Sequence, residues 1–197
     1  MKYFKFLLLI TLIYSCNQVK EKSKPVELEV TKKQPTEKFI YKDAYISNAF
    51  DFPVGKSNGK GYYNAQKFTE NDHLGEDWNG VGGGNTDLGD TIYAVANGYV
   101  KYTEDIGGGW GNVIRINHKL PNGKMIESFY AHCDTILINK GNWVKKGVAI
   151  ATIGTANGSW LAHLHFEMRD NLQLPIGPGY SSNTKGYINP TEFINNH

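Results

Sequence analysis

The stretch AHLHFEMR, residues 162–169, decides how the fold is interpreted. Successive side chains of a β-strand point to opposite faces, so every second residue shares a face. One face carries large apolar residues: Leu164, Phe166 and Met168. The other carries ionisable residues: His163, His165 and Glu167. Burying each apolar side chain stabilises the strand by roughly 1.5–3 kcal/mol, so the register is fixed without the histidines, and we expect one buried and one chemically active face.

Short runs rich in β-branched and aromatic residues continue this pattern from about residue 45 onward. They are TIYAVA (91–96), YVKYT (99–103), NVIRINH (112–118), MIESFYAH (125–132) and VAIATI (148–153). Such runs, broken by glycine, asparagine and proline, are typical of strands. Asn122 and Gly123 supply a tight turn between the third and fourth runs. With no long amphipathic helical pattern and one short turn at most in residues 189–197, the sequence predicts an all-β, mainly antiparallel domain over residues 45–197.

Length and charge limit the class of protein. A chain of 197 residues, 40% of them hydrophobic, can bury one good core and is too short for two ordinary domains. The formal net charge is only +2, and the lysines are spread along the chain. The low net charge and the spread of the lysines argue against nucleic acid as a partner. We also expect the protein to be a monomer.

The N-terminal segment MKYFKFLLLITLIYSC, residues 1–16, has the pattern of an export signal. Two lysines precede an apolar run that is well short of the ~20 residues needed to span a bilayer. A cysteine directly after such a run resembles the lipobox of bacterial lipoproteins. We expect residues 1–15 to be a signal peptide and Cys16 a lipidated N-terminus that anchors an exported protein to a membrane of the bacterial envelope, facing the periplasm. An ordinary signal peptide with a cysteine nearby by chance is the alternative.

Residues 16–44 mix lysine, glutamate and proline with few large apolar residues. This composition predicts a disordered tether between the lipid and the domain. Cys133, the second of two cysteines, would then have no disulfide partner in the chain. On a continuing strand its thiol points away from the side of His132, so we interpret Cys133 as a packing residue.

The segment HLGED (73–77) places His73 and Asp77 four residues apart, on one face of a strand or helix. With His165 they offer two imidazole nitrogens and one carboxylate. Three such ligands leave the fourth tetrahedral position of zinc open for water, which is typical of a catalytic site. Either spacing alone is a weak signal, because a lone histidine is more often structural. Both together, with the FYAH run (129–132) between them, form a specific pattern.

On these motifs the chain resembles the lysostaphin-like (LytM-type) zinc endopeptidases of bacterial cell walls. The matching segments also include TIYAVANGYV (91–100), GNVIRINH (111–118), GNWVKKGVAIATIG (141–154), HLHFE (163–167) and INP (188–190), and together they cover about residues 70–190. The resemblance implies a barrel-sandwich-hybrid-like peptidase domain with a zinc groove that hydrolyses peptide cross-links or stem peptides of peptidoglycan. It implies one zinc ion, with these ligands: His73, Asp77 and His165. It further implies two unliganded catalytic partners: His132 and His163.

Within this arrangement, Tyr130 and His132 would share one strand face, and His163 would share a face with His165. One imidazole would accept a proton and the other would stabilise an oxyanion, and the assignment of these roles to His132 and His163 is left open. Glu167 would either orient an imidazole or be a solvated carboxylate.

We expect three other ionisable residues to take no part in the metal site. Glu76 is adjacent to Asp77 and should point away from the metal. His118, beside the hairpin, and the terminal His197 are expected at the surface.

Two segments depart from the family pattern. Trp160-Leu161-Ala162 stands where family members usually carry a small Gly-Pro pair, and residues 78–90 are longer and more polar than the usual link. We expect these departures to affect substrate preference and not zinc binding. Whether residues 45–70 lie across the groove as an inhibitory segment is left open.

Two further classes compete with an enzyme. A domain of this type can bind the cell wall or regulate a hydrolase without cutting, but such members typically lack one or more metal ligands, and this chain keeps all three. The turn GNWVKKG (141–147) resembles turns of biotinyl and lipoyl carrier domains, but the chain lacks a Met-Lys attachment hairpin. Both comparisons favour a peptidase.

Overall fold

The computed structural model describes residues 39–197, so the expected signal peptide (1–15) and Cys16 lie outside the described residues. The strands are β1 (Tyr62–Gln66), β2 (Glu76–Gly80), β3 (Thr91–Tyr93), β4 (Gly98–Asp105), β5 (Asn112–Lys119), β6 (Met125–Ile136), β7 (Trp143–Val144), β8 (Ala149–Ile153), β9 (Leu164–Arg169) and β10 (Tyr187–Ile188). The helical elements are η1 (Asp43–Tyr45), η2 (Gly55–Gly59), η3 (Glu70–Asp72) and α1 (Pro190–Asn195). No helix within residues 39–197 has both the length and the apolar character to cross a membrane.

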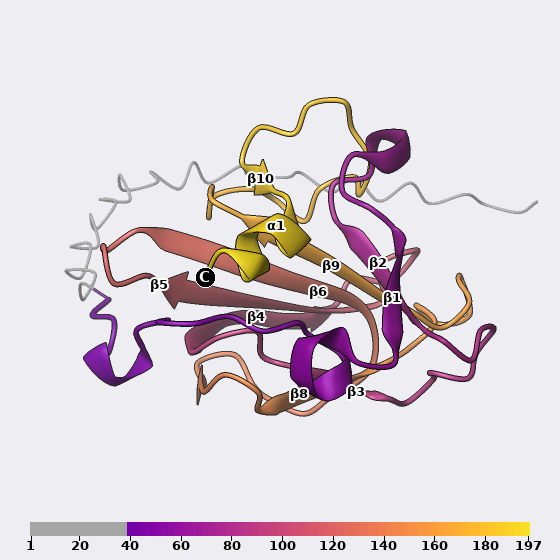
Figure 1. Ribbon diagram of the computed structural model, residues 1–197, viewed down its shortest axis with the longest axis horizontal. Coiled ribbons are helices and arrows are strands. Elements are labelled where there is room, and N and C mark those ends of the chain that lie inside the picture. Colours follow the sequence, from indigo (N-terminus) through magenta and orange to yellow (C-terminus); the bar gives the residue numbers. More distant parts are fainter. Residues whose placement is uncertain (1–38) are drawn as a thin grey trace, which may run out of the picture. The chain divides into compact units, whose positions relative to one another are not determined.

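All strand pairs are antiparallel, which confirms the predicted fold class. The strand order is β1-β2-β9-β6-β5-β4-β7, with β10 on β9 and β8 joining β6 to β3 (Figure 1). The β5–β6 hairpin turns where expected, because Gly123 takes a φ of 86° that glycine adopts without steric penalty. The short strands β1, β7 and β10 were not predicted.

The apolar face of β9 lies in the core, as predicted. Its residues Leu164, Phe166 and Met168 are all 0% exposed, and Phe166 packs against the ring of Tyr130 at 5.3 Å between centroids. The opposite face of β9 is buried as well, and there Arg169 contacts the carbonyls of Pro175 and Ile176 in the following loop. Cys133 is buried in the same core, which confirms its interpretation as a packing residue.

A β-bulge in β6 corrects the predicted position of His132. One residue of β5 faces two residues of β6 between the pairs Asn112–Cys133 and Ile114–Tyr130. His132 takes a left-handed backbone conformation with φ 61°. The prediction that Tyr130 and His132 share a face is therefore wrong. Tyr130 points into the core, whereas His132 turns to the opposite side of the sheet.

Residues 39–44, which we expected in the tether, contact the domain. Their aromatic rings gather at Trp143, with ring centroids 6.0 Å away for Phe39 and 4.8 Å for Tyr41. The hydroxyl of Tyr41 also donates to the carbonyl of Asn117 at 3.2 Å. The ordered contacts thus begin several residues before the expected boundary at residue 45.

His118 is 0% exposed, so its predicted surface position is wrong. Its Nδ1 donates to the carbonyl of Asn97 at 2.8 Å, and its Nε2 lies 2.7 Å from the hydroxyl of Ser128. Phe50, from the segment before β1, packs against the ring at 5.5 Å. Burial lowers the pKa of His118 to about 4, so the imidazole is neutral in the folded protein.

This buried histidine predicts a dependence of stability on pH. Below its ordinary pKa of about 6.5, the unfolded chain binds a proton at His118 that the folded chain excludes. The free energy of unfolding should therefore fall as pH drops from about 6.5 towards 4, by up to about 1.4 kcal/mol per pH unit from this residue. Urea unfolding of the zinc-free chain at pH 7.5 and at pH 5 measures this decrease in the free energy of unfolding. The decrease should be smaller in His118→Gln than in the wild type. The control is His197→Gln, a substitution at an exposed position, which should show the wild-type decrease. A decrease in His118→Gln as large as in the wild type would contradict the role of His118 in this pH dependence.

Candidate metal centre

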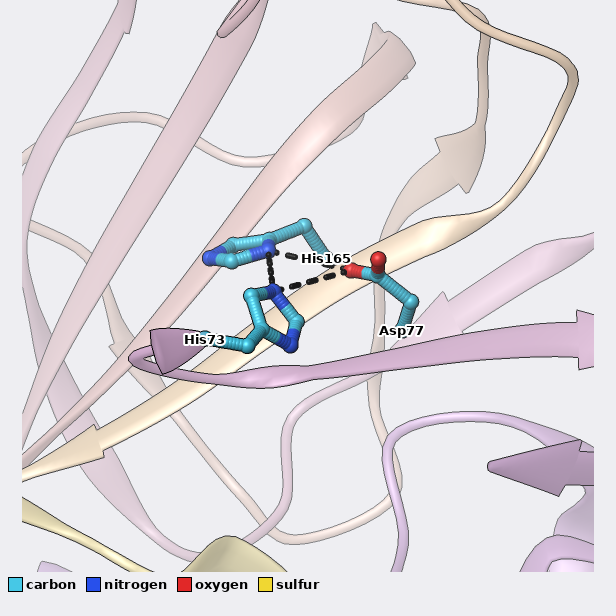
Figure 2. A group of neighbouring side chains, drawn as sticks. All are labelled: His73, Asp77 and His165. Atoms are coloured by element: carbon cyan, nitrogen blue, oxygen red, sulfur yellow. Dashed lines mark hydrogen bonds and ion pairs between the residues drawn. The ribbon is translucent and has the colours of Figure 1, made fainter. Parts of the chain in front are cut away.

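Three predicted ligands converge between β2 and β9. Asp77 on β2 pairs directly with His165 on β9, and His73 precedes β2 in a bridge with Tyr180. His73 Nε2 lies 3.0 Å from His165 Nδ1 and 3.5 Å from Asp77 Oδ1, and His165 Nδ1 lies 3.1 Å from the same oxygen. Figure 2 shows these three atoms facing one another. The structure thus brings together side chains separated by 92 residues in the chain.

This donor set fits a zinc ion. Tetrahedral bonds of 2.0–2.1 Å place neighbouring ligand atoms about 3.3 Å apart, close to the three observed distances. His165 Nε2 lies 3.0 Å from Glu167 Oε1, a carboxylate that can only accept, so the neutral ring carries its proton there and leaves Nδ1 bare. Bare nitrogens and a carboxylate oxygen repel at such distances unless a cation or a proton lies between them.

The surrounding charge favours a cation at this point. Burial alone would lower the pKa of His165, but hydrogen bonds to Asp77 and Glu167 outweigh it and raise this pKa to about 9. Burial and the neighbouring His165 lower the pKa of His73. Burial works against ionisation of Asp77 as well, yet its bond to His165 and the nearby histidines bring its pKa below the usual value. The carboxylates of Asp77 and Glu167 therefore stabilise a positive charge at the buried His165.

The sequence left open whether Glu167 orients an imidazole or is a solvated carboxylate, and the structure supports the first alternative. Its side chain is 0% exposed, and it orients His165 instead of facing solvent. Glu76, as predicted, points away from the three ligands: it binds the indole Nε1–H of Trp78 at 3.2 Å and the hydroxyl of Thr191 at 2.9 Å.

His132 and His163 form a second imidazole pair beside the candidate ligands. Their ring centroids lie 4.7 Å apart. Each places Nδ1 near a backbone carbonyl, at 3.3 Å from Trp110 for His132 and 2.8 Å from Leu161 for His163. Because each Nδ1–H donates to a carbonyl, each Nε2 is left unprotonated in the neutral ring. His163 Nε2 lies 3.7 Å from Asp77 Oδ1.

Burial governs the charge of His132. Together with the neighbouring His165 and His163, it lowers the pKa of His132 to about 3. In the absence of a metal this ring is thus a neutral proton acceptor.

A groove of about 430 Å³ is lined by four of these five residues, Asp77, His132, His163 and His165, whereas His73 is fully buried beside it. Aromatic side chains form much of its wall: Trp110, Trp160 and Tyr180. Trp160 donates its indole N–H to the carbonyl of Gly109 at 2.8 Å, and Tyr180 packs over His73 with centroids 5.0 Å apart. Of residues 45–70, all of which the structure describes, Gln66 alone lines the groove. This segment therefore leaves the groove open.

Sequence reasoning missed several supporting residues. Asn85, in the unusually long link after Asp77, accepts a hydrogen bond from the backbone N–H of Ala162 at 2.8 Å. The link therefore supports the segment that carries His163. Arg169 could have been found, because its position continues the two-residue period of residues 163, 165 and 167. Tyr180 follows a Pro-Gly segment with no strand pattern, so no sequence signal indicated it.

Comparisons with known proteins agree with this geometry. The sequence profile of Peptidase family M23 matches residues 73–178, more than half of the chain. Lipoprotein NlpD of Yersinia enterocolitica is 43% identical over 81 residues, which cover 41% of this chain and 78% of that protein. Murein hydrolase activator NlpD of Salmonella dublin is 42% identical over 81 residues, which cover 41% of this chain and 20% of that protein. The chain thus aligns with only a fifth of the length of this second relative.

A solved structure shows the same fold. Csd3 of Helicobacter pylori superposes with a TM-score of 0.51 at 21% identity, over 75% of this chain and 35% of that one. The chain belongs to peptidase family M23. This confirms the resemblance to the LytM-type peptidases that the motifs indicated.

Proposed function

We propose that this protein is a zinc-dependent endopeptidase that hydrolyses peptide cross-links or stem peptides of bacterial peptidoglycan. The observation that carries the proposal is the convergence of His73 Nε2, Asp77 Oδ1 and His165 Nδ1 within 3.5 Å of one another beside a groove. These three residues would hold one zinc ion. When bound, zinc supplies a Lewis acid that polarises a carbonyl and lowers the pKa of water from about 15.7 towards 7.

The protein's own residues would handle the proton and orient the peptide. His132 and His163 line the groove, and the neutral ring of each leaves Nε2 unprotonated, so either can accept a proton from the attacking water. The resulting imidazolium can donate a hydrogen bond to the oxyanion or pass the proton to the leaving amine. The backbone carbonyls of Trp110 and Leu161 hold both rings in the required tautomer.

The charge of the residues that line the groove supports cleavage at an internal bond of the substrate peptide. Among the described residues that line it, none is a lysine or an arginine. A free C-terminal carboxylate would therefore find no cationic side chain to pair with. An internal amide bond needs no such partner, and the aromatic wall can pack against uncharged parts of the peptide.

The test uses the purified chain, loaded with zinc or stripped of it, and muropeptides of defined cross-link. Mass spectrometry should detect two new peptide ends with the zinc-loaded chain and none after chelation. Intact muropeptides in the presence of a chain that has bound zinc would contradict the proposal.

A non-cutting regulator is the second candidate, because one relative is named a murein hydrolase activator. Both readings predict binding to cell-wall material. In the regulator, replacing His163 would leave function unchanged, since a proton acceptor is then unnecessary. Stimulation of a separate cell-wall hydrolase by a zinc-loaded chain that cuts nothing itself would favour the regulator.

Trp160 offers a prediction about substrate binding. This residue is 51% exposed and forms part of the groove wall. In Trp160→Ala we expect KM for a defined muropeptide to rise about five- to tenfold with kcat nearly unchanged, because an aromatic contact of about 1 kcal/mol is lost equally from substrate and transition state. Leu161→Ala, which removes an exposed apolar side chain outside the groove lining, is the matched control. Equal KM values for both variants in steady-state kinetics would count against the prediction.

The proposal also places the protein outside the cytoplasmic membrane, anchored through a lipid on Cys16. The signal-like segment 1–16 supports this, and so does the relative named Lipoprotein NlpD. Cys16→Ser should move the protein from the membrane fraction to the soluble fraction, as detected by immunoblot after fractionation. A variant that remains in the membrane fraction would disprove lipid anchoring at Cys16.

A further inference from the structure

The loop of residues 171–180 connects β9 to one wall of the groove. Its end carries Gly179 and Tyr180, which line the groove beside the metal ligands. The backbone N–H of Leu74 donates to the carbonyl of Gly179 at 2.9 Å, and Tyr180 forms a β-bridge with His73. The end of the loop therefore contacts the segment that carries the first ligand.

Arg169, the last residue of β9, is 0% exposed and holds the middle of the loop. Its Nη1 donates to the carbonyl of Pro175 at 2.8 Å, and its Nη2 donates to the carbonyl of Ile176 at 2.7 Å. Its Nε donates to Glu167 Oε2 at 2.6 Å, and Nη1 lies 3.7 Å from Glu127 Oε1. A guanidinium has five N–H donors in a rigid plane, so this one group joins the loop to two buried carboxylates.

Glu167 continues this connection to the second histidine ligand. Its Oε2 faces Arg169, and its Oε1 lies 3.0 Å from Nε2 of His165. A carboxylate fixed in this way keeps the proton of His165 on Nε2, and Nδ1 stays free towards Asp77. The loop thus reaches His165 through Arg169 and Glu167, and it reaches His73 through its own backbone.

We propose that Arg169 is a positioning residue that couples the metal centre to the groove wall formed by the 171–180 loop. The inference rests on the proposed function, because it takes His165 as a zinc ligand. Arg169 orients His165 through Glu167 and holds the loop through two carbonyls. Zinc affinity therefore depends on Arg169, and zinc binding orders the loop.

The first test measures zinc affinity by competition with a chelator of known affinity. In Arg169→Lys the charge remains, but a single ammonium cannot hold Glu167 and both carbonyls together. We expect zinc to bind at least tenfold more weakly, within the 10–100-fold range typical of residues that orient a ligand. The matched control is Arg115→Lys, because Arg115 binds Glu127 and the carbonyl of Leu174 and has no bond to Glu167. Its affinity should stay within about threefold of wild type.

A folded Arg169→Lys variant with wild-type affinity would overturn the inference, as would an equal loss in both variants. The second test needs no substitution: hydrogen exchange of residues 171–180 is measured in the wild-type chain with and without zinc. Zinc should slow exchange of the loop amides several-fold and leave β4 and β5 unchanged, and unaltered loop exchange would overturn the inference. A chain that binds zinc and cuts no muropeptide would overturn the proposed function alone.

Discussion

His165→Ala should abolish zinc binding and hydrolysis together, whereas His163→Ala should keep zinc and lose hydrolysis. His165 contributes Nδ1 to the three-atom cluster, and its removal leaves two ligands, too few for a stable site. His163 lies outside that cluster and lines the groove. Loss of a general acid or base lowers the rate about 10²- to 10⁴-fold.

Chelator competition measures the affinity of each variant, and mass spectrometry of digested muropeptides measures its rate. Zinc affinity of His163→Ala should remain within about threefold of wild type. His197→Ala, in which an exposed histidine outside the groove is removed, should match wild type in both measurements. An equal loss of metal in His163→Ala and His165→Ala would refute the division of roles between the two histidines.

Gly75→Ala should also disturb the metal centre, although glycine contributes no ligand. A Cβ at Gly75 would lie 2.6 Å from the carbonyl oxygen of Phe166, 2.8 Å from Cγ of Glu167 and 3.1 Å from Cε1 of His165. The first of these atoms belongs to the backbone, so β2 would have to move away from β9. Overpacking of this kind lowers the free energy of unfolding by about 1–3 kcal/mol.

We expect zinc affinity in Gly75→Ala to fall at least tenfold, because the movement separates Asp77 from His165. Urea unfolding of the zinc-free chain gives the stability, and chelator competition gives the affinity. Gly109→Ala is the control, since its Cβ would meet Trp160 at an ordinary contact distance of 3.4 Å. If Gly75→Ala binds zinc as tightly as Gly109→Ala, zinc affinity does not depend on the close approach of β2 and β9.

The sequence predicted the parts of the site that obey local rules. The period of β9 placed His163 and His165 on one side, and the spacing of His73 and Asp77 placed both near a single point. The apolar face of β9 is buried because burial fixes its register. The β5–β6 hairpin follows from the local preference of Gly123, which takes the positive φ of the turn, whereas Asn122 does not.

The errors arise where distant parts of the chain decide the outcome. The position of His132 depends on a bulge, and a bulge interrupts the alternation from which its face was predicted. His118 is buried because Phe50 and the carbonyl of Asn97 cover it, and neither adjoins it in sequence. The short strands β1, β7 and β10 exist through pairing with other strands and carry too few residues to show a period.

The left-handed backbone at His132 has a consequence for variation at this position. A residue other than glycine, asparagine or aspartate adopts that conformation at an expense on the order of 1–2 kcal/mol. A chain selected for thermal resistance alone would therefore drift towards glycine or asparagine at position 132. Under the proposed function, an imidazole at this position lowers the stability of the fold and supplies a proton acceptor, so stabilising replacements at this residue are expected among homologues that do not catalyse the reaction.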